Sequence, residues 1–489
     1  MKKETTTLLI NLPGKSIRTP EEHCGLAFLK AFGEQQGYHI DILDAYAEGI
    51  SMDQCKARVA KWLNCHYNSI RFVGISPFVT SHSEFVELGE FIRNMDSDCC
   101  IYAGGHYASL NKEYLIDNLS WLDAIIVGEG EITMIDLLEK GINDFIPGLF
   151  TRANRNSFVQ RERIQNLDVL PFQARYLTLE QLRGQPMTIT TSRGCYGECS
   201  FCSISSFYKL NSCTIKQTFR SATSVSDEIH CLFDKYKINS LKIVDDNFFR
   251  GNSDDFLEKL TEKICDLNIS FRLSARPNDI TPNRARYLKK MGASIIGIGV
   301  ESADEKSLQL FNKGIDISDS ERAIEILNNE KITCLINYIM FNPILDMDGL
   351  MKNCLFVEKH SDVSVFHRIN SHLWLRTTDP MVQRLRSLGL CTGEGFPYVE
   401  YTYCHEEVET VKCLFDLWCN HNMKEYYRYA DILMAQGIAG NEDIDANYRK
   451  LLREDIIVLK TLIDMAKNND LNSQGTKYIE NCLLNGVIQ

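Results

Sequence analysis

The first 150 residues alternate short apolar runs with stretches in which apolar residues recur at helical spacing. The apolar runs predict strands at 7–13, 39–45, 71–76, 100–105 and 124–129. The periodic stretches predict helices at 24–36, 53–66, 82–95 and 131–140. Strands that alternate with helices form a parallel sheet covered on both faces. We therefore expect a doubly wound, Rossmann-like α/β domain over residues 1–150.

A second alternating pattern follows a proline-broken linker at 151–185. Its predicted strands are 186–193, 240–247, 270–276, 294–300, 333–340 and 363–370, and the stretches between them have helical periodicity. Six such units are two short of a closed eight-unit barrel, so residues 186–375 predict a partial (β/α)6 barrel. Residues 376–489 predict a mainly helical region, which includes the amphipathic stretch 445–469.

Small and polar residues gather where the strands of the first domain end. They are Ser76, the run Gly104-Gly105-His106, and the run Gly128-Glu129-Gly130-Glu131. Ligands of such sheets bind at the carboxyl ends of the strands, and glycine allows a backbone to approach a ligand closely. Tight turns between strands and helices would also explain these glycines. Their occurrence at consecutive strand ends favours a binding site.

Three cysteines lie close together just after the first strand of the predicted barrel. Cys195, Cys199 and Cys202 have the spacing C-x3-C-x2-C, on a loop at the end where barrel active sites form. A zinc site would need a fourth ligand, and the nearby His230 falls on a predicted helix. A [4Fe–4S] cube held by three thiolates leaves one iron open to a small molecule. We therefore expect an iron–sulfur site.

This loop resembles that of the radical S-adenosylmethionine (radical SAM) superfamily, C-x3-C-x-aromatic-C, with Phe201 as the aromatic residue. The resemblance implies that the open iron chelates S-adenosylmethionine and that one electron cleaves it to a 5′-deoxyadenosyl radical. It also implies cofactor contacts at the ends of later strands. These candidates are Asp245, Asp246, Asn247, Ser274, Arg276 and Glu301. Ion pairs at the rim of the barrel would be an alternative role for the charged ones.

A doubly wound domain ahead of a radical SAM barrel resembles the cobalamin-binding class of that superfamily, the class B methylases. The matching pieces are VGIS, AGGHYAS, VGEGEIT and LDVLP. The chain lacks the D-x-H-x-x-G cobalamin motif, because Glu21 stands two residues before His23. Relatives in this class also lack it. The resemblance therefore implies three cofactors, namely a [4Fe–4S] cluster, S-adenosylmethionine and cobalamin, and methylation of an unactivated carbon.

Composition limits the kinds of partner and the cellular compartment that we expect for this protein. The net charge is −12, which argues against binding nucleic acid, and no apolar stretch reaches membrane-spanning length. Eighteen cysteines without a secretory signal suggest the reducing cytoplasm. We expect a small-molecule or peptide substrate from natural-product biosynthesis, a one-electron reductant such as flavodoxin or ferredoxin, and a monomer or weak oligomer.

Three alternatives stay open at this stage. The same barrel would serve a radical lyase, deoxygenase or cyclase that transfers no methyl group and binds no cobalamin. A cobalamin or redox sensor would use the cluster only to report. A second cluster on Cys391, Cys404, Cys413 and Cys419 has no compact ligand spacing to support it.

Overall fold

The structure is a computed structural model of all 489 residues. It describes residues 5–14, 21–143, 145–182, 184–210, 216–250, 253–393, 395–485 and 487. Contacts between residues divide the chain into two compact units. The first is Met1–Tyr196 with Ser203–Val244, and the second is Gly197–Cys202 with Asp245–Gln489. The boundaries expected at residues 150, 185 and 375 stay predictions.

The first unit is built on a six-stranded sheet. Its strands are β1 (Thr5–Asn11), β2 (His39–Asp44), β3 (Ile70–Ile75), β4 (Cys100–Ala103), β5 (Ala124–Ile126) and β6 (Leu149–Phe150), in the order β2-β1-β3-β4-β5-β6. All neighbours are parallel except β5 and β6. Leu9 pairs with both Ile42 and Gly74, so β1 is central. A central strand buried on both faces reads as a continuous apolar run, as in TLLIN.

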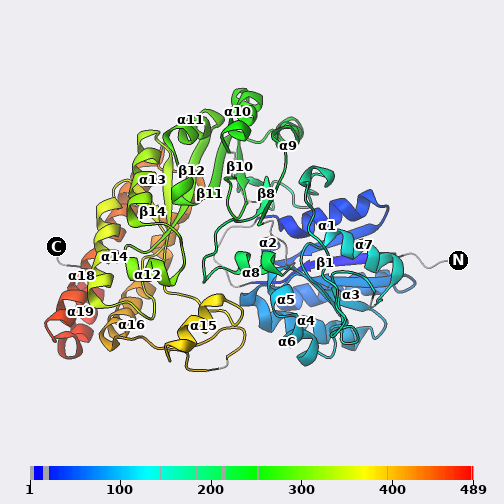
Figure 1. The fold of residues 1–489 in the computed structure, drawn as a ribbon, viewed down its shortest axis with the longest axis horizontal. Coiled ribbons are helices and arrows are strands. Elements are labelled where there is room, and N and C mark those ends of the chain that lie inside the picture. The colour runs from blue at the N-terminus through cyan, green and yellow to red at the C-terminus, as the bar shows by residue number, and fades with distance from the viewer. Residues whose placement is uncertain are drawn as a thin grey trace. The chain divides into compact units, whose positions relative to one another are not determined.

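Helices cover this sheet and bury its apolar side chains. They are α1 (Cys24–Gln35), α2 (Ala45–Glu48), α3 (Met52–Cys65), α4 (His82–Met95), α5 (Gly105–Leu110), α6 (Lys112–Asn118) and α7 (Glu131–Lys140). Figure 1 shows α1 and α7 next to each other, where they pack together. Leu26 of α1 and Leu137 of α7 share one core with Ile40 and Phe72 of the sheet. Burial of such side chains is the main stabilising contribution.

The first unit also contains the strands and helices that flank the cysteine loop. They are β7 (Met187–Ile189), β8 (Ser192–Gly194), α8 (Ser203–Lys209), β9 (Gln217–Phe219), α9 (Ala222–Tyr236) and β10 (Ser240–Ile243). β7 and β10 pair in parallel, whereas β8 and β9 form a separate antiparallel pair. The expected strand 186–193 is therefore two short strands, and it is β8 that ends just before Cys195.

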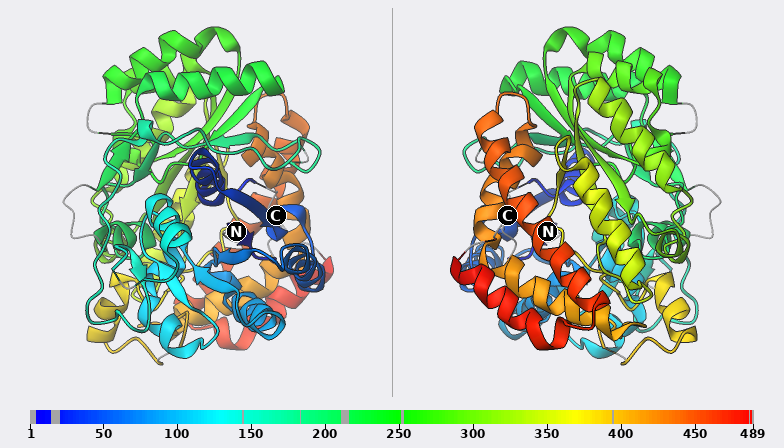
Figure 2. Two further views of the ribbon diagram at one scale, coloured as in Figure 1. Left: turned by 90° about the vertical axis from the view of Figure 1, so that its right-hand side faces the viewer. Right: turned by 90° about the vertical axis from the view of Figure 1, so that its left-hand side faces the viewer.

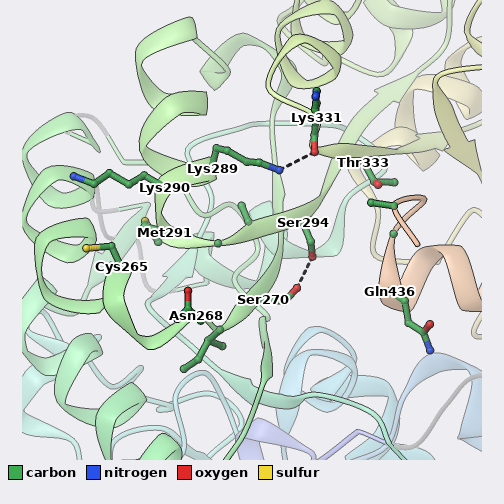
Figure 3. A pocket seen from close by; sticks show the side chains of 15 residues that line it. Cys265, Asn268, Ser270, Lys289, Lys290, Met291, Ser294, Lys331, Thr333 and Gln436 are labelled. Atoms are coloured by element: carbon green, nitrogen blue, oxygen red, sulfur yellow. Dashed lines mark hydrogen bonds between the residues drawn. The ribbon is translucent and has the colours of Figure 1, made fainter. Parts of the chain in front are cut away.

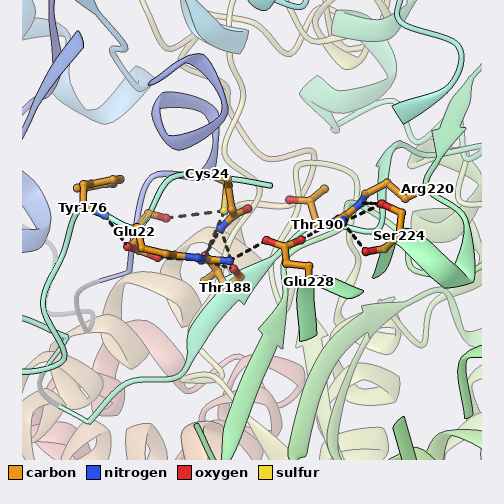
Figure 4. Close-up of polar contacts among 10 residues, drawn as sticks. Glu22, Cys24, Tyr176, Thr188, Thr190, Arg220, Ser224 and Glu228 are labelled. Carbon is orange, nitrogen blue, oxygen red and sulfur yellow. Dashed lines mark hydrogen bonds and ion pairs between the residues drawn. The ribbon is translucent and has the colours of Figure 1, made fainter. Parts of the chain in front are cut away.

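A buried ion network connects distant parts of the first unit (Figure 4). Arg175 donates to Glu22 and to Glu228, at 2.9 Å each, and to the carbonyl of Thr188 in β7 at 2.7 Å. Arg220 donates to Glu228 and to the carbonyl of Thr190. The side chains of Arg175, Glu22 and Glu228 are 7%, 0% and 1% exposed, so bulk water does not screen these charges. The network fixes the linker and α9 against the chain that leads into the cysteine loop.

The second unit contains four parallel strands in the order β14-β13-β12-β11. They are β11 (Ser270–Ala275), β12 (Ala293–Glu301), β13 (Thr333–Tyr338) and β14 (Ser364–Phe366). The helices among them are α10 (Ser253–Ile264), α11 (Pro282–Met291), α12 (Glu305–Leu310), α13 (Ile317–Asn329) and α14 (Met347–His360). Figure 1 shows α11 and α13 along these strands, and both contact β12. Together with β7 and β10, all six expected barrel strands are formed.

The C-terminal region is helical, as expected. It contains α15 (Pro380–Ser387), α16 (Glu406–His421), α17 (Met423–Gln436), α18 (Glu442–Lys467) and α19 (Leu471–Asn485). In Figure 2 the orange-to-red helices α16–α19 lie side by side, and α18 packs on α14, α16, α17 and α19.

Two tyrosines of these helices form hydrogen bonds with the edge of β14 that pairs with no other strand of its sheet. The backbone N–H of Phe366 donates to the Tyr448 hydroxyl at 2.7 Å, and the Tyr426 hydroxyl donates to the Phe366 carbonyl at 3.2 Å. Both tyrosine side chains are fully buried. They supply the hydrogen bonds that another strand would give to this edge of the sheet.

Candidate active site

The second half of the cysteine loop is held by neighbouring elements of the second unit. Ser200 donates its backbone N–H to Phe311 and its hydroxyl to Leu310, at 2.8 Å each. The carbonyl of Ser200 accepts from the backbone of Met381 at 2.9 Å. The Phe201 ring meets Phe311 edge-on, with centroids 5.2 Å apart. These contacts position Cys199 and Cys202 on either side of an anchored Ser200-Phe201 pair.

Arg276 lies directly against one of the three cysteines. Its Nη1 donates to Sγ of Cys199 at 3.5 Å, and its Nη2 donates to the carbonyl of Lys313. Arg276 and Cys199 are each only 7% exposed. The resemblance predicted that Arg276 contacts S-adenosylmethionine, and that contact stays a prediction. The structure places Arg276 against Cys199, which is expected to hold the iron–sulfur cube.

Glu301 ends β12 with a backbone conformation that is costly for a residue with a side chain. Its φ is +70°, a strained value that clusters at functional sites. Its Oε1 accepts from Nζ of Lys313 at 2.9 Å, and both side chains are nearly buried. A Cβ at Gly299 would lie 2.4 Å from that Oε1 and 2.7 Å from that Nζ, so only glycine leaves room for the ion pair. Lys313 therefore fixes the carboxylate of Glu301.

Some of the candidate residues near the ends of β10 and β11 lie close together in the structure, and others do not. Asn247 is buried, accepts from the backbone of Arg276 at 3.2 Å and donates to Asp279 at 3.1 Å. Asp245 is buried, whereas Asp246 and Ser274 are exposed. Asn247 therefore helps to fix Arg276, and cofactor contacts by Asp245, Asp246 and Ser274 stay predictions.

The three cysteines fit an iron–sulfur cube by their chemistry. Thiolates are the ligands such clusters take, and each thiolate binds a different iron. The cysteines therefore need not converge on one point. Within the described parts of the chain, no three or more His, Cys, Asp or Glu side chains gather tightly enough to hold a single metal ion.

Polar and aromatic groups converge at the carboxyl edge of the sheet in the first unit. Nδ1 of His23 accepts from the backbone N–H of Leu26 at 3.3 Å, and Nε2 lies 3.1 Å from Oγ of Ser76. Burial lowers the pKa of His23, so the ring is neutral, with its proton on Nε2. Ser76 thus accepts from His23. No acceptor for the Ser76 hydroxyl proton is found among the residues that the structure describes.

The surroundings of Ser76 leave room for a ligand. Gly105 has φ +85°, and a Cβ there would lie 3.2 Å from Oγ of Ser76. Phe78 packs against His23 with centroids 5.6 Å apart, yet its side chain is 53% exposed. An exposed aromatic ring beside a hydroxyl that can donate suits an amphipathic ligand. Gly104 follows the end of β4, and Gly128 lies two residues beyond the end of β5, at the same edge of the sheet.

The other expected ligand contacts of the first unit have packing partners. Oε1 of Glu131 binds Arg193 at 2.5 Å, and Oε1 of Glu129 lies 3.5 Å from Arg163 and 3.8 Å from Arg193. Burial raises the pKa of Glu129, and Arg193 opposes that shift. The His106 ring lies 4.0 Å from that of Phe207 in α8. These side chains therefore have partners within the first unit, and the ligand contacts expected of Glu129, Glu131 and His106 stay predictions. Gly130 precedes α7.

A cavity of about 400 Å³ lies at the opposite end of the strands of the second unit (Figure 3). Ser270, Ser294 and Thr333 line it near the starts of β11, β12 and β13, far along the strands from Glu301. Lys289 and Lys290 belong to the last turn of α11, where cations offset the helix dipole. Lys289 and Lys290 therefore have a structural explanation.

The segment after β14 packs on the cysteine loop and contains a buried carboxyl group. Asp379 lies two residues before Met381, and its Oδ2 accepts from the backbone of Arg376 at 2.9 Å. Burial raises its pKa to about 6, although Arg376 lies 3.6 Å away and opposes the shift. Above pH 6 the Asp379 carboxyl group is ionised in the native protein, and this buried charge lowers the free energy of unfolding.

Asp379→Asn is expected to stabilise the protein at pH 8 but not at pH 4. The raised native pKa favours the protonated form, so wild-type stability falls as the pH rises from about 4 through about 6. A neutral amide avoids this penalty, and we expect a gain of about 1–3 kcal/mol at pH 8. Urea unfolding at both pH values measures it.

Asp362→Asn is the control, because that carboxylate is 72% exposed and its removal should change the free energy of unfolding by less than about 0.5 kcal/mol. An equal loss of stability at both pH values in Asp379→Asn would contradict the assignment.

Comparison with known proteins now identifies the domain built around the loop. Residues 189–349 match the model of the radical SAM superfamily. The protein carries a radical SAM domain. Such a domain implies a [4Fe–4S] cluster and S-adenosylmethionine, so the chain is an enzyme with the cofactors that its three cysteines predict.

The curated relatives of this radical SAM enzyme include methylases and cyclases. An uncharacterised methyltransferase of Pyrococcus horikoshii is 26% identical over 65% of this chain and 69% of its own length. The hopanoid C-3 methylase of Methylococcus capsulatus is 27% identical, but the chain spans only 51% of its length. An anaerobic magnesium-protoporphyrin IX monomethyl ester cyclase of Synechocystis is 23% identical over 75% of each chain.

Solved structures show the same fold. The cobalamin-dependent S-adenosylmethionine radical enzyme OxsB, solved with aqua-cobalamin and S-adenosylmethionine, matches 99% of this chain and 79% of its own, with a TM-score of 0.79 and 16% identity. The radical methyltransferase TsrM from Kitasatospora setae, solved with cobalamin and a [4Fe–4S] cluster, gives a TM-score of 0.64 at 17% identity over 81% of this chain and 77% of its own. The expected fold class, a Rossmann-like domain followed by a radical SAM barrel and a helical region, is confirmed.

Two further observations concern the expectations about membrane spans and about a second cluster on the C-terminal cysteines. No helix within the described residues combines the length and apolar character needed to span a bilayer. Among the C-terminal cysteines, Cys419 is buried whereas Cys404 and Cys413 are exposed.

Proposed function

We propose that this radical SAM enzyme binds cobalamin and methylates an unactivated carbon of a small-molecule or peptide substrate. The observation that carries the proposal is the set of groups at the carboxyl edge of the first sheet, in a chain that also has a radical SAM loop. His23 directs the Ser76 hydroxyl, Gly105 leaves space beside it, and Phe78 offers an exposed ring. Cobalamin has amide groups around an extended ring system, so a donor next to an aromatic ring suits it.

The chain's own residues would have separate tasks. Cys195, Cys199 and Cys202 would hold the cube, and Glu301 and Lys313 would form a fixed polar pair beside it for S-adenosylmethionine. Ser76 would donate to an amide oxygen of cobalamin, and Phe78 would contact its ring. When bound, the cube supplies the electron that cleaves S-adenosylmethionine, and cobalamin carries the methyl group. Flavodoxin or ferredoxin would supply electrons in the cytoplasm, to a monomer or weak oligomer.

Radical chemistry without methyl transfer is the second candidate. It is supported by the relatives named as anaerobic cyclases of magnesium-protoporphyrin IX monomethyl ester. In that case the first unit would serve as a scaffold, and cobalamin would be absent from the purified protein.

Purification without oxygen from cells supplied with cobalamin tests the proposal. We expect about four irons and one cobalt per chain, and a substrate that gains the mass of one methyl group. Iron without cobalt would overturn the cobalamin assignment and favour the second candidate. Neither metal, from protein that is folded by circular dichroism, would overturn both.

A pair of His23 variants tests the proposed cobalamin contact itself. An asparagine amide can replace Nδ1 and keep the hydrogen bond to Leu26, whereas a glutamine amide can replace Nε2 and donate to Ser76. We expect His23→Asn and Ser76→Ala to weaken hydroxocobalamin binding by about 10-fold, the loss of roughly one hydrogen bond. His23→Gln should bind within about threefold of wild type. Equal affinities in a spectroscopic titration of all four proteins would remove Ser76 from the site.

A further inference from the structure

The contact between Arg276 and Cys199 has a chemical consequence beyond holding the loop. The guanidinium is charged at every accessible pH, and its N–H donates to a sulfur that becomes a thiolate when it binds iron. Arg276 and Cys199 are both 7% exposed, so little water screens the charge. The second arm of the guanidinium is fixed by the carbonyl of Lys313, and the backbone of Arg276 is fixed by Asn247.

Lys313, whose backbone carbonyl binds Arg276, also carries a positive charge, but its side chain has a different partner. Nζ of Lys313 forms an ion pair with Glu301 at 2.9 Å, and that carboxylate offsets its charge. The guanidinium of Arg276, in contrast, donates directly to the sulfur of a predicted cluster ligand. Hydrogen bonds to cluster sulfurs and nearby charge are among the factors that set the reduction potential of iron–sulfur centres.

We propose that Arg276 is a redox-tuning residue, which raises the reduction potential of the cube through its N–H···S contact with Cys199. Reduction adds one electron, from a flavodoxin- or ferredoxin-class donor, and increases the negative charge shared by the irons and their thiolates. A fixed cation at one thiolate stabilises the reduced state more than the oxidised one. No bond to Arg276 forms or breaks. The reaction starts from the reduced cube, so Arg276 makes the first step accessible to a mild reductant.

Substitution of Arg276 tests the proposal through the reduction potential of the cube rather than through the turnover rate of the enzyme. Arg276→Gln removes the charge, and we expect the equilibrium constant for reduction to fall about 10-fold, which is about 59 mV for one electron. Arg276→Lys keeps the charge but loses the planar fork, so its potential should fall by less. The measurement is a redox titration followed by electron paramagnetic resonance, on reconstituted enzyme without S-adenosylmethionine.

Arg272→Gln is the matched control. Arg272 lies in β11, four residues and about 13 Å along the chain before Arg276, which follows the end of that strand, and it donates to the carbonyl of Met434 at 3.0 Å. The control loses the same charge and should keep the wild-type potential. A wild-type potential in Arg276→Gln, or an equal shift in Arg272→Gln, would overturn the proposal.

A measurement on the unaltered enzyme covers the case in which the variants do not assemble a cluster. Wild-type protein with 15N-labelled arginine is expected to show a nitrogen hyperfine coupling to the reduced cube, because the guanidinium lies against Cys199. Absence of this coupling would overturn the proposal. Neither experiment needs cobalamin or a substrate, so failure of the proposed methylation leaves this test unaffected.

Discussion

Cys199→Ser is expected to abolish the iron–sulfur cluster and all cleavage of S-adenosylmethionine. With two thiolates left, two irons of the cube lack a protein ligand, and the buried site beside Arg276 loses the negative charge that balances the cation. Loss of residues around a metal ligand already lowers metal affinity or activity 10- to 100-fold, so loss of the ligand itself should exceed about 100-fold. Iron content, the visible absorption band and release of 5′-deoxyadenosine measure the effect.

Cys231→Ser is the control for this prediction, since Cys231 is an exposed cysteine of α9. It should keep the wild-type iron content and activity. Cys199→Ser protein that still holds about four irons per chain would contradict the assignment of the loop.

Arg175→Met is expected to cause the largest loss of stability among single changes in the first unit. Methionine replaces the apolar stem of the arginine side chain but leaves Glu22 and Glu228 buried without the shared cation between them. Breaking a buried ion pair by removing one partner costs about 3–5 kcal/mol. Unfolding by urea, followed by circular dichroism without oxygen, should show a lower midpoint. Cluster content should fall as well, because the network binds β7, which is followed by β8 and then by the cysteine loop.

The first unit offers a matched control in an exposed pair. Arg155 contacts Asp117 at 2.6 Å, with side chains 48% and 42% exposed. Arg155→Met removes an equally close contact, yet water screens it, so its cost should stay below about 1 kcal/mol. Adding Glu22→Gln to Arg175→Met should recover part of the loss, since it removes one uncompensated charge. Equal midpoints for Arg175→Met and Arg155→Met would show that the network does not stabilise the fold.

The sequence predicted most of the architecture because buried parallel strands and amphipathic helices leave strong local patterns. The strands around Leu9, Ile101 and Ile298 are all continuous apolar runs and formed where expected. The exceptions are short pieces with weak patterns. β6 contributes only Leu149-Phe150 as an antiparallel edge, and β8 is the sequence Ser-Arg-Gly. Such strands depend on neighbours that are remote in sequence.

The site was predictable to the extent that its chemistry depends on local spacing. The family match agrees with the identification from Cys195, Cys199 and Cys202, whose motif spans eight residues. Partners far apart in the sequence were not predictable. Arg276 lies 77 residues from Cys199, and Ser76 lies 53 residues from His23. The sequence named Arg276 and Ser76 as candidates but gave no sign of what each would contact.

The tyrosines that bind the edge of β14 limit which fragments of this enzyme can be expressed as folded proteins. The radical SAM match ends at residue 349, before β14 begins at Ser364. Tyr426 and Tyr448, which complete that strand, are supplied by α17 and α18. A catalytic fragment trimmed to the family boundaries would leave a bare sheet edge able to pair with other chains. An expression fragment therefore has to include α17 and α18, and also α19, which packs on α16 and α18.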